Sequence, residues 1–179
     1  MDETVSTIEK NHLQRAPVSS SGRGGFWLAV VLATVGIGVL LSGVFSGATG
    51  LFGDVGEVTF SDGFRETWRE LVRVLLFSTL LLVALRVNCW RVRRSLGNFS
   101  LAALRCLAIV AIIESVRVVQ IPHGVSRVFL VSASQYLLLF LCFFGLFKVT
   151  ARESIVFTTS CTVALIVLWV GSMLGNWVS

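Results

Sequence analysis

Charged residues are scarce in this chain. Asp, Glu, Lys and Arg together make up 14% of its 179 residues, whereas 55% are hydrophobic and the mean hydropathy is +0.84. A soluble globular domain carries about a quarter charged residues and could not bury this much apolar surface. The composition therefore excludes an ordinary soluble protein and predicts an integral membrane protein. The length leaves no room for a separate enzyme domain, since five spans of about 20 residues use most of the chain.

Signatures of catalysis and of metal binding are also absent from the sequence. It contains no H-E-x-x-H, G-x-S-x-G or G-x-x-x-x-G-K-[ST] motif. Its two histidines, His12 and His123, are predicted on opposite sides of the membrane, and its four cysteines have no C-x-x-C spacing. We therefore expect no enzyme activity, no cofactor and no metal site.

Five hydrophobic runs are long enough to cross a bilayer. Each has about 20 residues, which corresponds to about 30 Å of helix, the thickness of the hydrocarbon core. The runs cover residues 26–46, 71–89, 100–121, 128–147 and 155–175. The predicted fold is an all-α bundle of five transmembrane helices over residues 26–179, preceded by a flexible cytoplasmic tail, residues 1–25. The alternative is four spans, if the third run lies in the interface or the first is cleaved as a signal peptide.

The third run is the least apolar, because it carries Arg105, Glu114 and Arg117. At about 100° per residue, Glu114 points about 180° and Arg117 about 120° away from Arg105. An interfacial helix needs a single polar face, and these charges do not form one. The pattern therefore favours a spanning helix.

Two tryptophans bracket the second run. Trp68 and Trp90 lie 22 residues apart, which is about 33 Å along a helix, and indole rings favour the two membrane interfaces. An outer loop is predicted over residues 47–68. Within its last part, Asp62 is a candidate N-cap, so the helix is predicted to begin in the interface before it enters the lipid.

Lysine and arginine set the orientation of the spans. With five crossings, ten of the 15 fall on the side of the N-terminus or reach it from a span end, and five fall on the other side. The N-terminus is therefore predicted to be cytoplasmic and the C-terminus outside, in the inner or plasma membrane of the cell. The net charge of +5 then reflects topology and contact with anionic lipids, and no nucleic acid partner is expected.

Polar groups at one predicted depth are the candidates for function. Ionisable side chains inside a bilayer are unfavourable unless paired or hydrated, which makes Glu114 the leading candidate, with Arg117 able to neutralise it. Ser78, Thr79 and Gln135 fall at about the same depth, about 10 to 12 Å below the outer surface. These five residues form either a polar layer or ion relay, or architectural contacts in which the hydroxyls bond their own helix.

Two further sets of residues predict contacts rather than chemistry. Small residues at four-residue spacing allow helices to approach closely, and this packing is predicted at Ser42, Gly43, Ser46 and Gly47. Basic residues beside a span bind anionic head groups, and lipid contact is predicted at Arg91, Arg93 and Arg94. The expected partners are membrane lipids and either further copies of the chain or another membrane protein.

Residues 69–152 carry an ordered set of features. In chain order they are a helix entered through Glu70-Leu71-Val72, a basic and aromatic turn over 90–99, a helix ending in Ala111-Ile112-Ile113, then Arg117-Val118-Val119 and His123, and a helix closing on Lys148 and Arg152. This layout resembles the phosphate-starvation-inducible small membrane protein family. The resemblance implies an inner-membrane protein and carries over no catalytic residue. The chain departs from that four-span pattern by its fifth helix and by Glu114.

Together these features predict a multi-pass membrane protein with a non-enzymatic structural, assembly or regulatory role. The alternative is a small oligomeric transporter or channel that uses the polar layer around Glu114.

Overall fold

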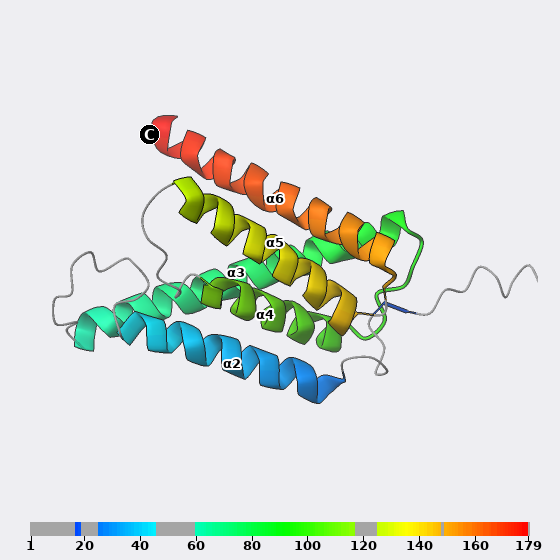
Figure 1. Cartoon of the computed structure of the whole chain (residues 1–179), viewed down its shortest axis with the longest axis horizontal. Coiled ribbons are helices and arrows are strands. Elements are labelled where there is room, and N and C mark those ends of the chain that lie inside the picture. The colour runs from blue at the N-terminus through cyan, green and yellow to red at the C-terminus, as the bar shows by residue number, and fades with distance from the viewer. Residues whose placement is uncertain (1–16, 19–24, 46–59, 117–124, 148, 179) are drawn as a thin grey trace, which may run out of the picture.

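The computed structural model describes residues 17–18, 25–45, 60–116, 125–147 and 149–178. Over these residues the chain is all-α, with five helices and no strand (Figure 1). The helices are α2 (Phe26–Phe45), α3 (Phe60–Arg91), α4 (Phe99–Ser115), α5 (Val125–Leu146) and α6 (Ala151–Val178). The prediction of an all-α helical bundle is thus confirmed.

Each predicted hydrophobic run corresponds to one helix. The runs 26–46, 71–89, 128–147 and 155–175 coincide largely with α2, α3, α5 and α6, while the third run coincides with α4 as far as Ser115. By length and composition, one described helix, α2, is able to cross a membrane, and Leu130–Leu146 is a shorter apolar stretch.

Helix α3 is continuous over 32 residues from Phe60, so residues 60–68 of the predicted outer loop are helical, and the helix begins before the apolar run as expected. Asp62 lies in the first turn rather than at the N-cap, and there its carboxylate interacts favourably with the helix dipole. One turn later the buried Glu66 lies 3.9 Å from the exposed Arg69, an i,i+3 pair. The helix therefore begins well before the apolar run that it carries.

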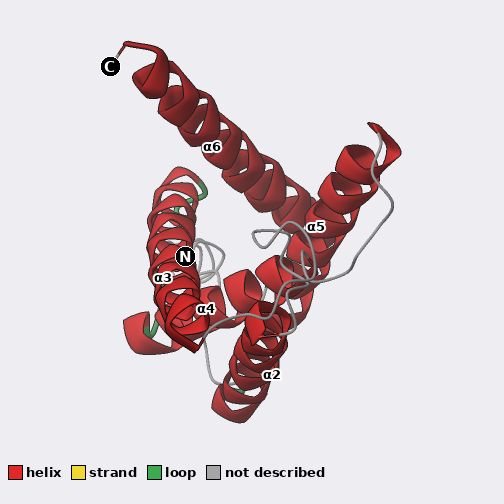
Figure 2. Cartoon of the chain, turned by 90° about the vertical axis from the view of Figure 1, so that its left-hand side faces the viewer, coloured by secondary structure: helices red, strands yellow, loops and turns green. Residues whose placement is uncertain are grey.

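The helices alternate in direction along the chain, and α4 is the central one. It contacts α2, α3 and α5, whereas α6 packs on α3 and α5. Figures 1 and 2 show α6 inclined away from α3 and α4 toward its C-terminal end. Because consecutive helices run in opposite directions, the N-terminal ends of α2, α4 and α6 lie at one end of the bundle, the shared end, with the C-terminal ends of α3 and α5.

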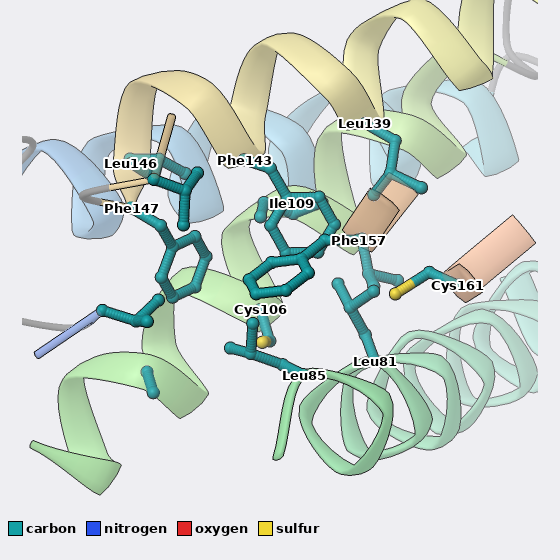
Figure 3. Packing of buried hydrophobic residues seen from close by; sticks show 14 of the residues in the cluster. Leu81, Leu85, Cys106, Ile109, Leu139, Phe143, Leu146, Phe147, Phe157 and Cys161 are labelled. Atoms are coloured by element: carbon teal, nitrogen blue, oxygen red, sulfur yellow. The ribbon is translucent and has the colours of Figure 1, made fainter. Parts of the chain in front are cut away.

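A buried apolar core joins the helices, and Figure 3 shows the packing of part of it. The rings of Phe143 in α5 and Phe157 in α6 pack edge to face with their centroids 6.1 Å apart. Leu85 of α3 and Cys106 and Ile109 of α4 belong to the same buried cluster. Four helices thus meet in one apolar layer, which fixes the ends of α3 and α6 against each other.

Val18 ties the segment before α2 to the same end of the bundle. Its side chain is fully buried in the same cluster as Leu96 and Val149, and its N–H donates to the carbonyl of Ser95 over 3.1 Å. The prediction of a flexible tail over residues 1–25 is therefore wrong at this position. The apolar side chain is held where the turn after α3 and the turn before α6 meet.

Candidate functional site

Glu114 pairs with an arginine of a neighbouring helix. It is buried on the last turn of α4, and its Oε2 lies 3.8 Å from Nε of Arg73 in α3. Arg73 also lies 3.9 Å from Glu70 and places its guanidinium 5.3 Å from the centre of the Phe77 ring. The predicted partner, Arg117, lies outside the described residues. Arg73 was missed because it is distant in the sequence, although it stands at the outer end of the second run, close to the predicted depth of Glu114.

The predicted polar layer is only partly assembled. Ser78 is buried and donates to the carbonyl of Leu75 over 2.9 Å, and Thr79 donates to the same carbonyl over 2.8 Å. Thr79 is exposed, because it is rotated by about 100° from Ser78 around α3. Gln135 is half-buried on α5. Both hydroxyls are therefore satisfied within their own helix, and Thr79 points away from the side on which Ser78 is buried.

Arg105 is fully buried in the middle of the bundle. Its Cζ lies 5.6 Å from the centre of the Phe147 ring, in a cation–π contact. The predicted orientation placed Arg105 with the cytoplasmic arginines, because its side chain was expected to extend through lipid to the interface. The central position of α4 removes that path, since its neighbours cover the arginine.

A second charged pair joins the turn after α3 to the first turn of α6. Arg94, just after α3, donates to Oε2 of Glu153 on the first turn of α6 over 2.8 Å, with side chains 7% and 13% exposed. The predicted lipid contact is therefore wrong for Arg94, because its guanidinium is buried and bound to a carboxylate. The pair links residues 59 positions apart in the sequence.

Glu153 also caps the start of α6. The N–H of Thr150 donates to Glu153 Oε2 over 2.9 Å, and the N–H of Glu153 donates to Thr150 Oγ1 over 3.3 Å. This reciprocal arrangement is a capping box, and the T-x-x-E spacing before an apolar run was a signal that could have identified it. Burial by itself raises the pKa of Glu153, but the Thr150 N–H and the Arg94 guanidinium outweigh it and hold that pKa below its ordinary value of 4.5.

Helix α3 ends in a Schellman motif formed around an arginine. The N–H of Arg94 donates to the carbonyl of Cys89 over 2.9 Å, and the N–H of Arg93 donates to the carbonyl of Trp90 over 3.2 Å. Arg93 adopts φ 53°, a left-handed conformation that usually calls for glycine. Arg91 and Arg93 are both exposed, and their contact with lipid head groups stays a prediction.

The close packing of small residues occurs between α2 and α4. The buried face of α2 comprises Ala29, Ala33, Gly36, Leu40, Gly43 and Val44. Gly43 was predicted to pack and does so, but Ser42 is exposed and donates to the carbonyl of Val39 over 3.2 Å. Ser46 and Gly47 lie outside the described residues. The closest approach is at Gly36, where a Cβ would lie 2.7 Å from the carbonyl carbon of Ala111.

Large apolar side chains cover much of the outer surface, while Glu66, Glu70, Arg105 and Glu114 are buried between helices and other charged residues, Arg69 and Arg91 among them, are exposed. Valine, leucine, isoleucine and phenylalanine side chains are exposed along α2, α3, α5 and α6. Trp27 and Trp90, 76% and 82% exposed, lie at the shared end, and Trp68, 66% exposed, lies near the opposite end of α3. Trp68 and Trp90 are separated by about 33 Å along one helix and lie within about 40° of each other around it. The exposed tryptophans therefore stand near both ends of α3 among exposed apolar side chains.

No cation site is formed by the residues that the structure describes: none of their His, Cys, Asp and Glu side chains gather in a group of three able to hold a metal ion.

Comparison with protein-family models, with curated proteins and with solved structures gave no match. The resemblance to the phosphate-starvation-inducible small membrane protein family stays a prediction.

Proposed function

We propose that this chain is a multi-pass integral membrane protein in which five helices cross the bilayer and buried ion pairs lock the helices together as a non-enzymatic scaffold. The observation that carries the proposal is the apolar surface: large apolar side chains face outward on four helices, while Glu114 is buried beside Arg73 and the Glu153 side chain, 13% exposed, is bound to Arg94. Lipid is the environment in which such a surface is stable.

The central position of α4 supports a crossing even though this helix carries two ionisable residues. A helix that faces lipid on several sides must be apolar, whereas a helix enclosed by protein can keep charges that its neighbours satisfy. Arg105 and Glu114 are both buried, and Glu114 contacts Arg73 of the adjacent helix. The low hydropathy of the third run is therefore compatible with spanning.

The proposed orientation places the N-terminus in the cytoplasm. At the shared end, Trp27 and Trp90 provide an aromatic belt, and the exposed arginines Arg91, Arg93 and Arg152 lie at that same end. Aromatic belts mark interfaces and arginines favour the cytoplasmic side. Labelling of single introduced cysteines from the two sides of a sealed membrane tests this topology.

A scaffold is favoured over a transporter because the polar groups near Glu114 are already satisfied. Ser78 and Thr79 bond a carbonyl of their own helix, and Arg73 lies beside the Glu114 carboxylate. A relay needs groups that can exchange protons or ions with a pathway. The arrangement therefore supports an architectural role for the charges.

Glu114→Gln separates the two roles. The scaffold predicts unchanged proton flux in vesicles reconstituted with the purified protein, and a melting temperature in detergent lower by a few degrees, because Arg73 loses a charged partner. Thr79→Ala is the control, since its side chain is exposed and should alter neither quantity. Loss of a measurable wild-type flux in Glu114→Gln, with its melting temperature unchanged, would support the transporter and contradict the scaffold.

A further inference from the structure

The buried pair between Arg94 and Glu153 brings together two segments that are far apart in the sequence. Arg93 precedes Arg94 in the turn after α3, and Arg152 precedes Glu153 on the first turn of α6. The 2.8 Å contact between the paired side chains places the turn after α3 near the start of α6. Arg93 and Arg152 are both exposed, as is Arg91, the last residue of α3.

Within the described part of the chain, no acid neutralises the positive charge of these three exposed arginines. Of the five acids among the described residues, Glu153 alone lies at this end of the bundle, and its carboxylate is bound to Arg94. In the part of the chain that the structure describes, no ion pair involves Arg91, Arg93 or Arg152. We call these three arginines, all exposed at the shared end of the bundle, the arginine triad.

The backbone at Arg93 indicates that this side chain has a use beyond ending the helix. The position takes φ 53° and completes a Schellman motif, in which glycine is the residue that adopts the conformation without strain. An arginine at this position lowers the stability of the fold, and it places a guanidinium in the turn that ends α3. Such strain is maintained where the side chain has a function.

The surroundings of the triad match the level of lipid head groups. Trp90 is highly exposed next to Arg91, and indole rings occupy the head-group region. Val83 and Val87 are exposed at four-residue intervals before Arg91, so the three side chains lie along one face of α3. This face offers an apolar track for an acyl chain that leads directly to a guanidinium.

We propose that Arg91, Arg93 and Arg152 form a binding site for the phosphate of an anionic phospholipid. Guanidinium groups bind phosphate through paired, charge-assisted hydrogen bonds, and the net negative charge of the head group matches the positive charge of the triad. The inference rests on the proposed membrane insertion. The proposed site differs from a general attraction between basic residues and anionic lipid, because it needs residues of both α3 and α6. Arg94 is not part of the site, since its guanidinium is bound to Glu153.

The test measures thermal unfolding of the full chain in nanodiscs of phosphatidylcholine alone and of phosphatidylcholine with roughly one third phosphatidylglycerol. Wild-type protein should melt at a higher temperature in the anionic discs, and R91Q/R93Q/R152Q should lose more than half of that increase. R65Q/R69Q is the matched control, because these arginines are exposed at the other end of α3 and meet the same lipid in the opposite leaflet. It should keep most of the increase, and an equal loss in both variants would overturn the site.

Arg93→Gly is a second variant, and the result expected for it differs from that expected if Arg93 had only a structural role. Glycine relieves the left-handed strain, so the protein should melt at a higher temperature than wild type in phosphatidylcholine discs but gain less from phosphatidylglycerol. A full gain from phosphatidylglycerol in this variant would contradict a role for Arg93 in binding.

Inorganic phosphate added to the phosphatidylcholine discs distinguishes a lipid from a soluble ligand. It should leave the melting temperature unchanged, and a shift equal to that caused by phosphatidylglycerol would overturn the lipid assignment. If the protein inserts into the discs but melts at the same temperature in both lipids, the lipid site is contradicted and the proposed function is not. If the protein fails to insert, both the site and the proposed function are contradicted.

Discussion

Replacing Gly36 with alanine should lower the free energy of unfolding by about 1 to 3 kcal/mol, the range for overpacking a tight contact. The added Cβ would lie 2.7 Å from the carbonyl carbon of Ala111 and 2.8 Å from the nitrogen of Ile112. Both are backbone atoms, so the contact is relieved only if α2 and α4 move apart. A larger residue, as in Gly36→Leu, should prevent the two helices from packing.

Gly38→Ala is the control for this prediction, two residues along the same helix. Gly38 is exposed, and no atom lies within 4 Å of the position its Cβ would take. Its substitution should be neutral, or stabilising by up to about 1 kcal/mol through helix propensity. Denaturant or thermal unfolding in detergent measures both variants. Equal destabilisation by the two substitutions would show that α2 does not pack on α4 through Gly36.

Replacing Arg94 with methionine should be the most damaging change at the other end of the bundle, with a loss of about 3 kcal/mol. It leaves the Glu153 carboxylate buried without its cation, and breaking a buried pair on one side costs about 3 to 5 kcal/mol. Adding Glu153→Gln should restore part of the loss, because glutamine keeps the capping acceptor for Thr150 without a charge. The difference between the stability loss of the double variant and the sum of the losses of the two single variants measures the interaction energy of the pair.

Arg65→Gln is the control for Arg94→Met. Arg65 is exposed on α3 and forms no ion pair among the described residues, so its removal should change the stability by no more than about 0.5 kcal/mol. A loss for Arg94→Met as small as this would contradict a buried pair between α3 and α6.

The same pair predicts how stability depends on pH. The pKa of Glu153 is lower in the folded state than in the unfolded chain, so its contribution is present above about pH 4.5 and is lost as the pH falls through the folded value. Wild-type protein should therefore lose more of its melting temperature on acidification below about pH 4.5 than Glu153→Gln, which has no group to titrate at this position. Parallel curves for the two proteins would contradict this role for the carboxylate.

The positions of the helices could be predicted from the sequence, because a run of about 20 apolar residues is a local property. The role of α4 could not. Its charges made it the weakest span when each run was judged as if surrounded by lipid, whereas its neighbours bury Arg105 and Glu114. Hydropathy contains no information on which helix lies at the centre.

The pairing of charges was equally inaccessible, because it depends on how distant segments meet. The contact of Glu114 with Arg73 was not predicted, and Arg94 was grouped with Arg91 as a lipid contact, although its partner lies 59 residues away. The capping of α6 by Thr150 is local and could have been predicted from its spacing. Local features can thus be predicted from the sequence, whereas the long-range contacts that define the candidate sites are found only in the folded structure.

The central claim, that the helices cross a membrane in alternating directions, is tested most directly by labelling single introduced cysteines with a membrane-impermeant maleimide in intact cells. Suitable positions are exposed at the start of three helices: Ser61 in α3, Ser100 in α4 and Ala151 in α6. The native cysteines are buried or half-buried in the bundle, and the unsubstituted protein provides the background. The account predicts labelling of Ser61→Cys from outside, and of Ser100→Cys and Ala151→Cys only after permeabilisation. Labelling of Ala151→Cys from outside while Ser100→Cys stays protected would show that α4 does not cross, and equal labelling at all three positions would contradict a membrane-spanning bundle.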